Sequence, residues 1–141
     1  MQEYIDFASN NLLIVIGFIA TLAFTIRFEL SRLNRKYKQV GVNQAVMILN
    51  KDDALVIDVR EDKEIKGGII KGARHVTLGQ LKTRMSEFNK SKNSPVLIYC
   101  RSGSRSGHAC QMFTKEGFEN VYNLSGGILA WEAANLPVTK R

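Results

Sequence analysis

One cysteine at the end of an apolar run has surroundings that suit chemistry. The stretch SPVLIYCRSGSRSGHACQMF (residues 94–113) places Cys100 directly after the apolar run 96–99 and before a short turn of serine, glycine and arginine. The thiolate, not the thiol, is the nucleophilic form of cysteine, and nearby positive charge and helix N-terminal N–H groups favour it. The turn therefore predicts a reactive Cys100 rather than a structural cysteine in an apolar site.

The residues of the turn are suited to holding negative charge. Gly103 allows a tight turn without steric conflict, and the backbone N–H groups of a turn that leads into a helix form a pocket for an anion. The arginines add positive charge, and Ser104 or Ser106 is expected to cap the helix. The candidate substrate-binding residues are Arg101, Ser102, Gly103, Ser104, Arg105 and Ser106.

The second cysteine, Cys110, is expected to be structural. It lies with Ala109 and Phe113 on the apolar side of the helix that follows the turn, and free cysteine is among the most buried residue types. Two cysteines are too few for a disulfide scaffold. Because His75 and His108 are the only histidines, no metal site is expected, and no cofactor.

Two reactions use a cysteine held in an anion-binding loop. In phosphatase chemistry the thiolate attacks phosphorus, and an arginine on the sixth residue after the cysteine clamps the phosphoryl oxygens. Here the sixth residue is Ser106 and the arginine, Arg105, is the fifth, so the loop is one residue too short. The other reaction is sulfur transfer, in which the thiolate takes up a sulfane sulfur and passes it on. The spacing favours sulfur transfer.

The elements around this loop predict an α/β fold with a mostly parallel sheet flanked by helices. Strands are expected at 54–60, 95–100 and 120–124, and helices at 43–50, 80–89, 106–116 and 126–136. Near-continuous apolar runs are typical of parallel strands buried on both faces, and alternation with helices is typical of βαβ units. Ligands of open α/β sheets bind beyond the carboxyl ends of the strands, which is where Cys100 is expected.

Three segments, in the same order, resemble the motifs of the rhodanese family of single-domain sulfurtransferases. CRSGSRS (100–106) resembles its active-site loop. VIDVREDKEIKGGIIKGARHV (56–76) is similar to its D-V-R-x-x-x-E-(x)-x-G-H-I-x-G-A segment, and LSGGILAWEAANLPV (124–138) is similar to its closing L-x-G-G-x-x-x-W-x-x-x-x-L-P-V. The resemblance covers about residues 41–139, and the expected rhodanese-like domain is residues 41–141.

The resemblance implies a sulfurtransferase in which Cys100 forms a persulfide. Backbone N–H groups from Arg101 through Arg105 would hold the sulfur donor and the persulfide, and Arg105 would add charge. The expected donor is a small compound such as thiosulfate or a persulfide, and the acceptor is a thiol, a cyanide-like nucleophile or a partner protein. The alternative is a rhodanese-fold module that binds partners or senses sulfur species at the membrane without turnover.

Other residues of these motifs are expected to support the structure around the site. Asp58 and Arg60 are expected to form a buried polar pair that ties the loops beneath the active site, and Trp131 is expected to fill the core behind a glycine pair. Gly68 stands where the family has the histidine of Gly-His-Ile, which implies altered local packing.

The N-terminal segment predicts a membrane helix at residues 1–28. No charged residue lies between Asp6 and Arg27, and this stretch approaches the ~20 residues that cross a bilayer. A cleaved signal peptide would begin with positive charge and end at an A-x-A-like site, whereas this segment begins with Glu3 and Asp6. An uncleaved single span is therefore expected.

The charges that follow the span predict its orientation and its partners. A basic juxtamembrane linker, residues 29–40, follows the span, and residues 27–38 hold five lysines and arginines against one glutamate. Basic residues stay on the cytoplasmic side, so the N-terminus is expected outside and the domain in the cytoplasm. The helix would contact membrane lipid, and the basic segment could touch anionic headgroups. The rest of the chain is mildly basic without an aromatic-interleaved stripe, so nucleic acid is not an expected partner.

Overall fold

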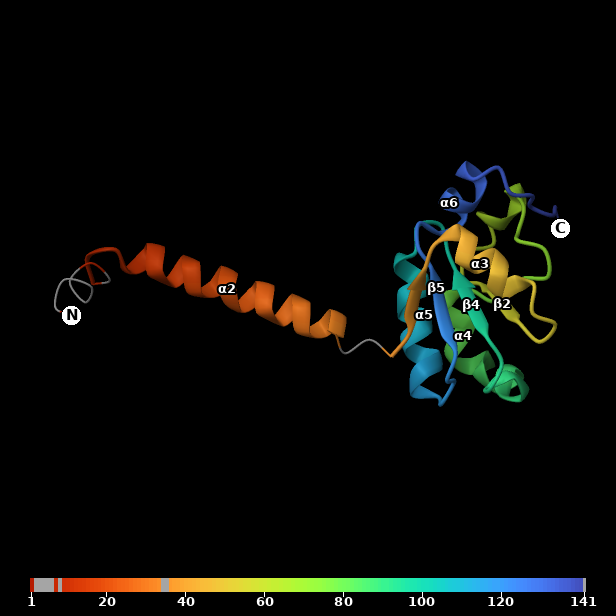
Figure 1. Cartoon of the computed structure of the whole chain (residues 1–141), viewed down its shortest axis with the longest axis horizontal. Helices are drawn as coiled ribbons and strands as arrows, with labels where there is room; N and C mark the ends of the chain where they lie inside the picture. Colours follow the sequence, from red (N-terminus) through yellow and green to blue (C-terminus); the bar gives the residue numbers. More distant parts are fainter. Residues whose placement is uncertain (2–6, 8, 34–35, 141) are drawn as a thin grey trace. The chain divides into compact units, whose positions relative to one another are not determined.

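The computed structural model describes residues 1, 7, 9–33 and 36–140, and the chain divides into two compact units, residues 1–35 and 36–141 (Figure 1). The first unit holds helix α2 (Leu12–Leu33), which has 22 residues. At 1.5 Å per residue it is about 33 Å long, enough for a ~30 Å hydrocarbon core.

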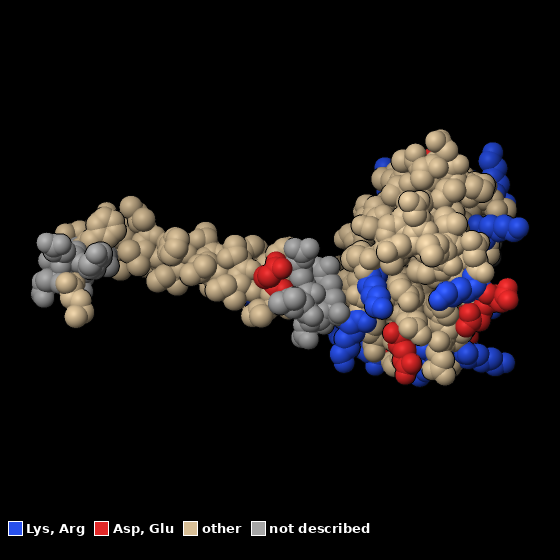
Figure 2. Space-filling view, in the orientation of Figure 1, with Lys and Arg blue, Asp and Glu red and all other residues tan. Residues whose placement is uncertain are grey.

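Helix α2 is the one helix of the described residues that is long and apolar enough to cross a membrane, over Leu12–Leu30. None of that stretch is buried, and Figure 2 shows little charge along most of its surface. A helix with apolar side chains on all sides suits a lipid environment. The expected apolar helix is therefore present. Glu3, Asp6 and Arg35, on which its expected orientation partly rests, lie outside the described residues.

The second unit contains a five-stranded sheet in the order β1-β5-β4-β2-β3, and all its strand pairs are parallel. Its strands are β1 (Lys38–Val40), β2 (Leu55–Asp58), β3 (Arg74–His75), β4 (Val96–Tyr99) and β5 (Val121–Leu124). Its helices are α3 (Val42–Leu49), α4 (Leu78–Arg84), α5 (Ser104–Lys115) and α6 (Gly127–Ala133), with short 3-10 turns at Ile65–Gly67 and Met85–Ser91. The expected α/β fold with a parallel sheet is confirmed.

Both faces of the sheet are buried because helices cover each of them. On one face, Ile57 and Ile98 pack against α4 and α5 through side chains such as Leu81 and Phe113. On the other face, their neighbours in the strands pack against α3 and α6, where Trp131 is buried. Trp131 is buried in the core, as the sequence predicts, and lies in α6, which begins at the second glycine of the pair 126–127. Two-sided burial explains why β2 and β4 are continuous apolar runs rather than alternating ones.

The boundaries of several elements differ from the expected ones. Residues 38–40 belong to the expected linker, yet they form edge strand β1, which pairs with β5. Helix α2 ends at Leu33, five residues beyond the expected end of the membrane helix at residue 28. Helix α5 begins at Ser104, two residues earlier than expected.

Candidate active site

Cys100 follows β4 directly and lies at the carboxyl edge of the sheet, as the sequence predicts. Its side chain is almost wholly enclosed, and the residue is 1% exposed. Its sulfur accepts hydrogen bonds from the Gly103 N–H at 3.1 Å and from the Ser106 hydroxyl at 3.3 Å. The loop therefore closes around Sγ and presents donors to it.

These donors determine the ionisation of the thiol. Burial by itself raises the pKa of Cys100, because an apolar surrounding disfavours the charged form. Hydrogen bonds from the Ser106 hydroxyl and from the loop N–H groups of Ser106, Gly103 and Ser102 outweigh that effect. The pKa of Cys100 is consequently below its ordinary value, which favours the thiolate, the nucleophilic form.

The start of α5 differs from the expected serine cap. The residue before the helix is Gly103, with φ of 99°, and no side chain caps the helix. The expectation that Ser104 or Ser106 would act as the cap is wrong, because the Ser106 hydroxyl is directed to Cys100 Sγ instead. Ser102 and Ser104 are exposed at the mouth of the loop.

The two arginines of the loop have different environments. Arg101 is exposed and lines a pocket together with Glu64, Ile128 and Glu132, among others. Arg105 donates two hydrogen bonds to the Glu64 carboxylate, at 2.6 and 2.7 Å. Its charge is therefore compensated within the protein.

Glu64 is a site residue that reasoning from the sequence missed. Its Arg105 partner lowers the pKa of Glu64 to about 2, so the ion pair contributes fully above the ordinary carboxyl pKa and is lost as the pH falls toward 2. Glu64 also accepts a hydrogen bond from the Glu61 N–H at 3.0 Å. The signal was present, because Glu64 is the glutamate of the D-V-R-x-x-x-E motif.

Asp58 and Arg60 form the buried pair that the sequence predicts. The guanidinium of Arg60 contacts the Asp58 carboxylate at 2.7 to 3.0 Å, and both residues are buried. Arg60 also donates to the carbonyl oxygens of Glu64 at 3.1 Å and Gly68 at 2.7 Å, and its own carbonyl contacts His75 Nε2 at 2.7 Å. The pair thus fixes the loop that carries Glu64 and supports Arg105.

The expectation that Gly68 replaces the family's histidine is wrong. Gly68 has φ of 124°, and a Cβ there would lie 2.8 Å from Val138 Cγ2, so this position requires glycine. The last two residues of the G-H-I-x-G-A motif correspond to residues 72–73. Counted back from there, Gly68 is the first glycine of the motif, and Ile69 stands at the position of the histidine. Ile69 is buried and exchanges backbone hydrogen bonds with Thr139 at 2.7 and 2.9 Å.

The start of α6 packs directly on the backbone of the loop. The Ile128 N–H donates to Cys100 O at 2.8 Å, and the Leu129 N–H donates to Arg101 O at 3.3 Å. Gly127 has φ of 57°, and a Cβ at this position would overlap both of those carbonyl groups. This approach of two backbones explains the glycine pair of the closing motif.

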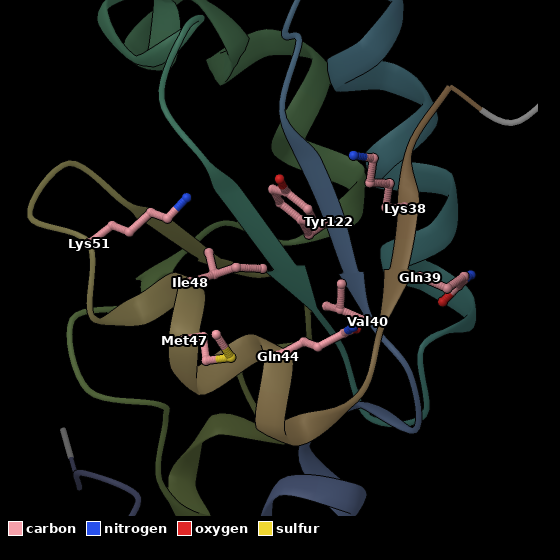
Figure 3. A pocket seen from close by; sticks show the side chains of 8 residues that line it. All are labelled: Lys38, Gln39, Val40, Gln44, Met47, Ile48, Lys51 and Tyr122. Atoms are coloured by element: carbon pink, nitrogen blue, oxygen red, sulfur yellow. The ribbon is translucent and has the colours of Figure 1, made fainter.

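A larger pocket, of about 640 Å³, lies elsewhere on the domain, between α3 and the edge of the sheet. Figure 3 shows Ile48 of α3 directed toward the strands that carry Val40 and Tyr122, with Met47 beside it on the helix. No residue of the cysteine loop lines this pocket, whereas Arg101 of the loop lines the smaller pocket.

The sequence of the chain is similar to those of known proteins, over nearly its whole length in one case and over the domain in another. "Uncharacterized protein YibN" of Escherichia coli is 29% identical over 141 residues, which cover 99% of each chain. A protein named "Sulfurtransferase" from Allochromatium vinosum is 41% identical over 87 residues, which cover 62% of this chain and 79% of the relative.

Comparison with a solved structure and with a family model identifies the family of the chain. A rhodanese-like domain protein from Staphylococcus aureus superposes with a TM-score of 0.62 and 25% identity, covering 72% of this chain and 98% of that one. The profile of the rhodanese-like domain matches residues 42–134. The relatives of the chain include a protein named "Sulfurtransferase". The chain belongs to the rhodanese-like family.

Proposed function

We propose that the protein is a sulfurtransferase that carries sulfur as a persulfide on Cys100, at the cytoplasmic face of the membrane. The observation that carries this proposal is the enclosed Cys100 sulfur, held by the Gly103 N–H and the Ser106 hydroxyl with a lowered pKa. Family membership supports the same reaction class.

The chemistry takes place in two displacements at sulfur. In the first, the Cys100 thiolate attacks the sulfane sulfur of a donor such as thiosulfate. A new S–S bond forms, and the bond between the donor's two sulfurs breaks, with its electron pair leaving on sulfite. In the second, an acceptor thiolate or cyanide attacks the outer sulfur of the persulfide, and Cys100 leaves as the thiolate. No external oxidant or reductant is needed.

The loop suits both displacements. A persulfide anion carries the same charge as the thiolate, so donors that stabilise one can stabilise the other. Arg105 is paired with Glu64, so backbone N–H groups and Ser106 are the donors available to the sulfur. Arg101 is exposed at the mouth, where an anionic donor such as thiosulfate would pass.

The test is thiocyanate formation from thiosulfate and cyanide by the full-length chain in detergent micelles. We expect Cys100→Ser to lower the rate by at least about a thousandfold, because it removes the nucleophile. Cys110→Ala is the matched control, since Cys110 is fully buried in the apolar core and burial raises its pKa. It should retain most of the activity.

Three outcomes would contradict the proposal. Turnover that persists in Cys100→Ser would place the reaction elsewhere. No turnover with any sulfur donor, together with a Cys100 that gains no sulfur atom by mass spectrometry, would favour a binding or sensing module. Cys100-dependent hydrolysis of para-nitrophenyl phosphate would instead indicate a phosphatase.

A further inference from the structure

Asn123 is a polar residue in the interior of the domain, and it contacts the cysteine loop. It lies in β5 and is 1% exposed. Its Nδ2 donates to the carbonyl oxygen of Gly103 at 2.9 Å and to Gln39 Oε1 at 3.2 Å. Its Oδ1 is buried and has no hydrogen-bond partner among the described residues.

The orientation of this amide is fixed by its partners. The Gly103 carbonyl can only accept a hydrogen bond, so Asn123 must present Nδ2 to it. Gln39 stands directly opposite Asn123 in the β1–β5 ladder. Figure 3 shows the Gln39 side chain pointing away from the side of β1 that carries Lys38 and Val40. Gln39 therefore supplies the second acceptor from the edge strand.

The same glycine that receives this hydrogen bond also donates one to the reactive sulfur. Gly103 has φ of 99°, and its N–H lies 3.1 Å from Cys100 Sγ. The Gly103 carbonyl also accepts a hydrogen bond from the Gly107 N–H at 3.2 Å, so this bond and the one from Asn123 together hold the peptide group that follows Gly103. Because a glycine has a wide choice of backbone conformations, fixing this peptide group limits the directions that the Gly103 N–H can take. A Cβ on Gly103 would lie 3.1 Å from Leu124 O, which shows how closely this turn approaches the end of β5.

We infer that Asn123 is a positioning residue for sulfur transfer. By holding the Gly103 carbonyl, it keeps the Gly103 N–H directed at Cys100 Sγ, and Gln39 holds the amide in place. Asn123 has no hydrogen bond to the sulfur itself, so it acts through Gly103. The inference deepens the proposed function, since the Cys100 thiolate that it stabilises is the proposed nucleophile.

The test is the pH dependence of Cys100 alkylation by iodoacetamide, measured on the full-length chain in detergent micelles. Only the thiolate reacts, so the midpoint of the rate profile reports its pKa. Asn123→Leu has similar volume and no donor. We expect its midpoint to rise by about one pH unit, so that well below both midpoints the rate falls about tenfold. Tyr122→Phe, which changes the neighbouring residue on the opposite face of β5, should keep the original midpoint.

A second variant keeps the test decisive if Asn123→Leu does not fold. Asn123→Thr suits a strand, but its hydroxyl sits on a shorter side chain that does not reach Gly103 O, and the same rise is expected. Gln39→Leu should give a smaller rise. A folded Asn123 variant with an unchanged midpoint would overturn the inference. Because alkylation requires no sulfur donor, this result is separate from a failure of the proposed sulfurtransferase activity.

Discussion

At the scale of single residues, the sulfur of Cys100 is stabilised by hydrogen-bond donors rather than by the arginine side chains. The sequence points to Arg101 and Arg105 as sources of positive charge, yet one is exposed and the other is paired with Glu64. The hydrogen bonds to Sγ come from a backbone N–H and a serine hydroxyl. Fixed dipoles around an enclosed atom act strongly because little water competes with them.

Ser106→Ala is expected to raise the pKa of Cys100. Ser106 is fully buried and its hydroxyl is the largest favourable contribution to the thiolate. A hydrogen bond to a charged group contributes roughly 1.5–3 kcal/mol, which corresponds to a rise of about one pKa unit or more. The alkylation midpoint should move to higher pH, and sulfur transfer below that midpoint should slow in proportion.

The matched control for this variant is Ser125→Ala. Ser125 is an exposed serine in the turn before α6, and the same loss of a hydroxyl there should leave the midpoint unchanged. If Ser106→Ala also leaves it unchanged while the chain stays folded, the hydroxyl does not stabilise the thiolate.

At the scale of elements, the cysteine loop is held between α5, which begins in it, and α6, which begins against it. Two N–H groups at the start of α6 bond the carbonyl groups of Cys100 and Arg101. The carbonyl groups of Cys100 and Arg101 are thus directed to α6, while the Gly103 N–H is directed to the sulfur. Gly127 permits this close contact because it has no Cβ.

Gly127→Ala is expected to destabilise the domain and disrupt the loop. The added methyl group would overlap two carbonyl groups at a backbone conformation that favours glycine. Strain of this kind costs on the order of 1–3 kcal/mol or more, so the melting temperature should fall by several degrees and thiocyanate formation should drop. Thermal unfolding followed by circular dichroism measures the first effect.

Gly79→Ala provides the comparison for Gly127→Ala. Gly79 lies in α4 with open space around the position of a Cβ. Alanine is about 1 kcal/mol more favourable than glycine inside a helix, so this variant should be as stable as the original chain or more so. Equal stability of the two variants would show that the α6 contact does not require glycine.

The main elements could be predicted from the sequence, while the short ones could not. Strands β2, β4 and β5 have four apolar-rich residues each and stand between helices, so pattern alone identifies them. Strand β1 has three residues, Lys38–Val40, at the end of a charged segment. Strand β3 has two, Arg74–His75. β1 and β3 are strands because they pair with β5 and β2. The local sequence pattern does not show this pairing.

The candidate site shows the same division. Cys100 and its loop, and the Asp58–Arg60 pair, are contiguous in the sequence and could be predicted from it. Glu64 contacts Arg105 across 41 positions, and Asn123 contacts Gly103 across 20. Long-range partners of this kind depend on which strand ends meet, so the fold is required to find them.

At the scale of the whole molecule, the chain joins an apolar helix to a rhodanese-like domain through a short basic segment. Lys38, the first residue of the sheet, follows the end of α2 by five positions. The proposed orientation depends on the basic residues just after the apolar stretch and on the acidic residues before it. The domain would then lie in the cytoplasm, where thiols stay reduced.

A reporter fused after the last residue is expected to behave as cytoplasmic. A reporter that works only after export should be inactive at this position, and one that works only in the cytoplasm should be active. Replacing Arg32, Arg35 and Lys36 with glutamate should lower the cytoplasmic signal, because it removes three of the five basic residues of 27–38 that favour the cytoplasmic side. Activity of the export-dependent reporter on the unaltered chain would contradict the orientation.

The seclusion of Cys110 makes this two-cysteine chain behave chemically as a one-cysteine chain. Its thiol lies in the apolar core, where burial raises its pKa well above the ordinary value. Reagents that seek thiolates should therefore attach one label per folded molecule, and a second label should report unfolding. The number of labels per molecule therefore reports whether the domain is folded, and neither cysteine has to be replaced for this measurement.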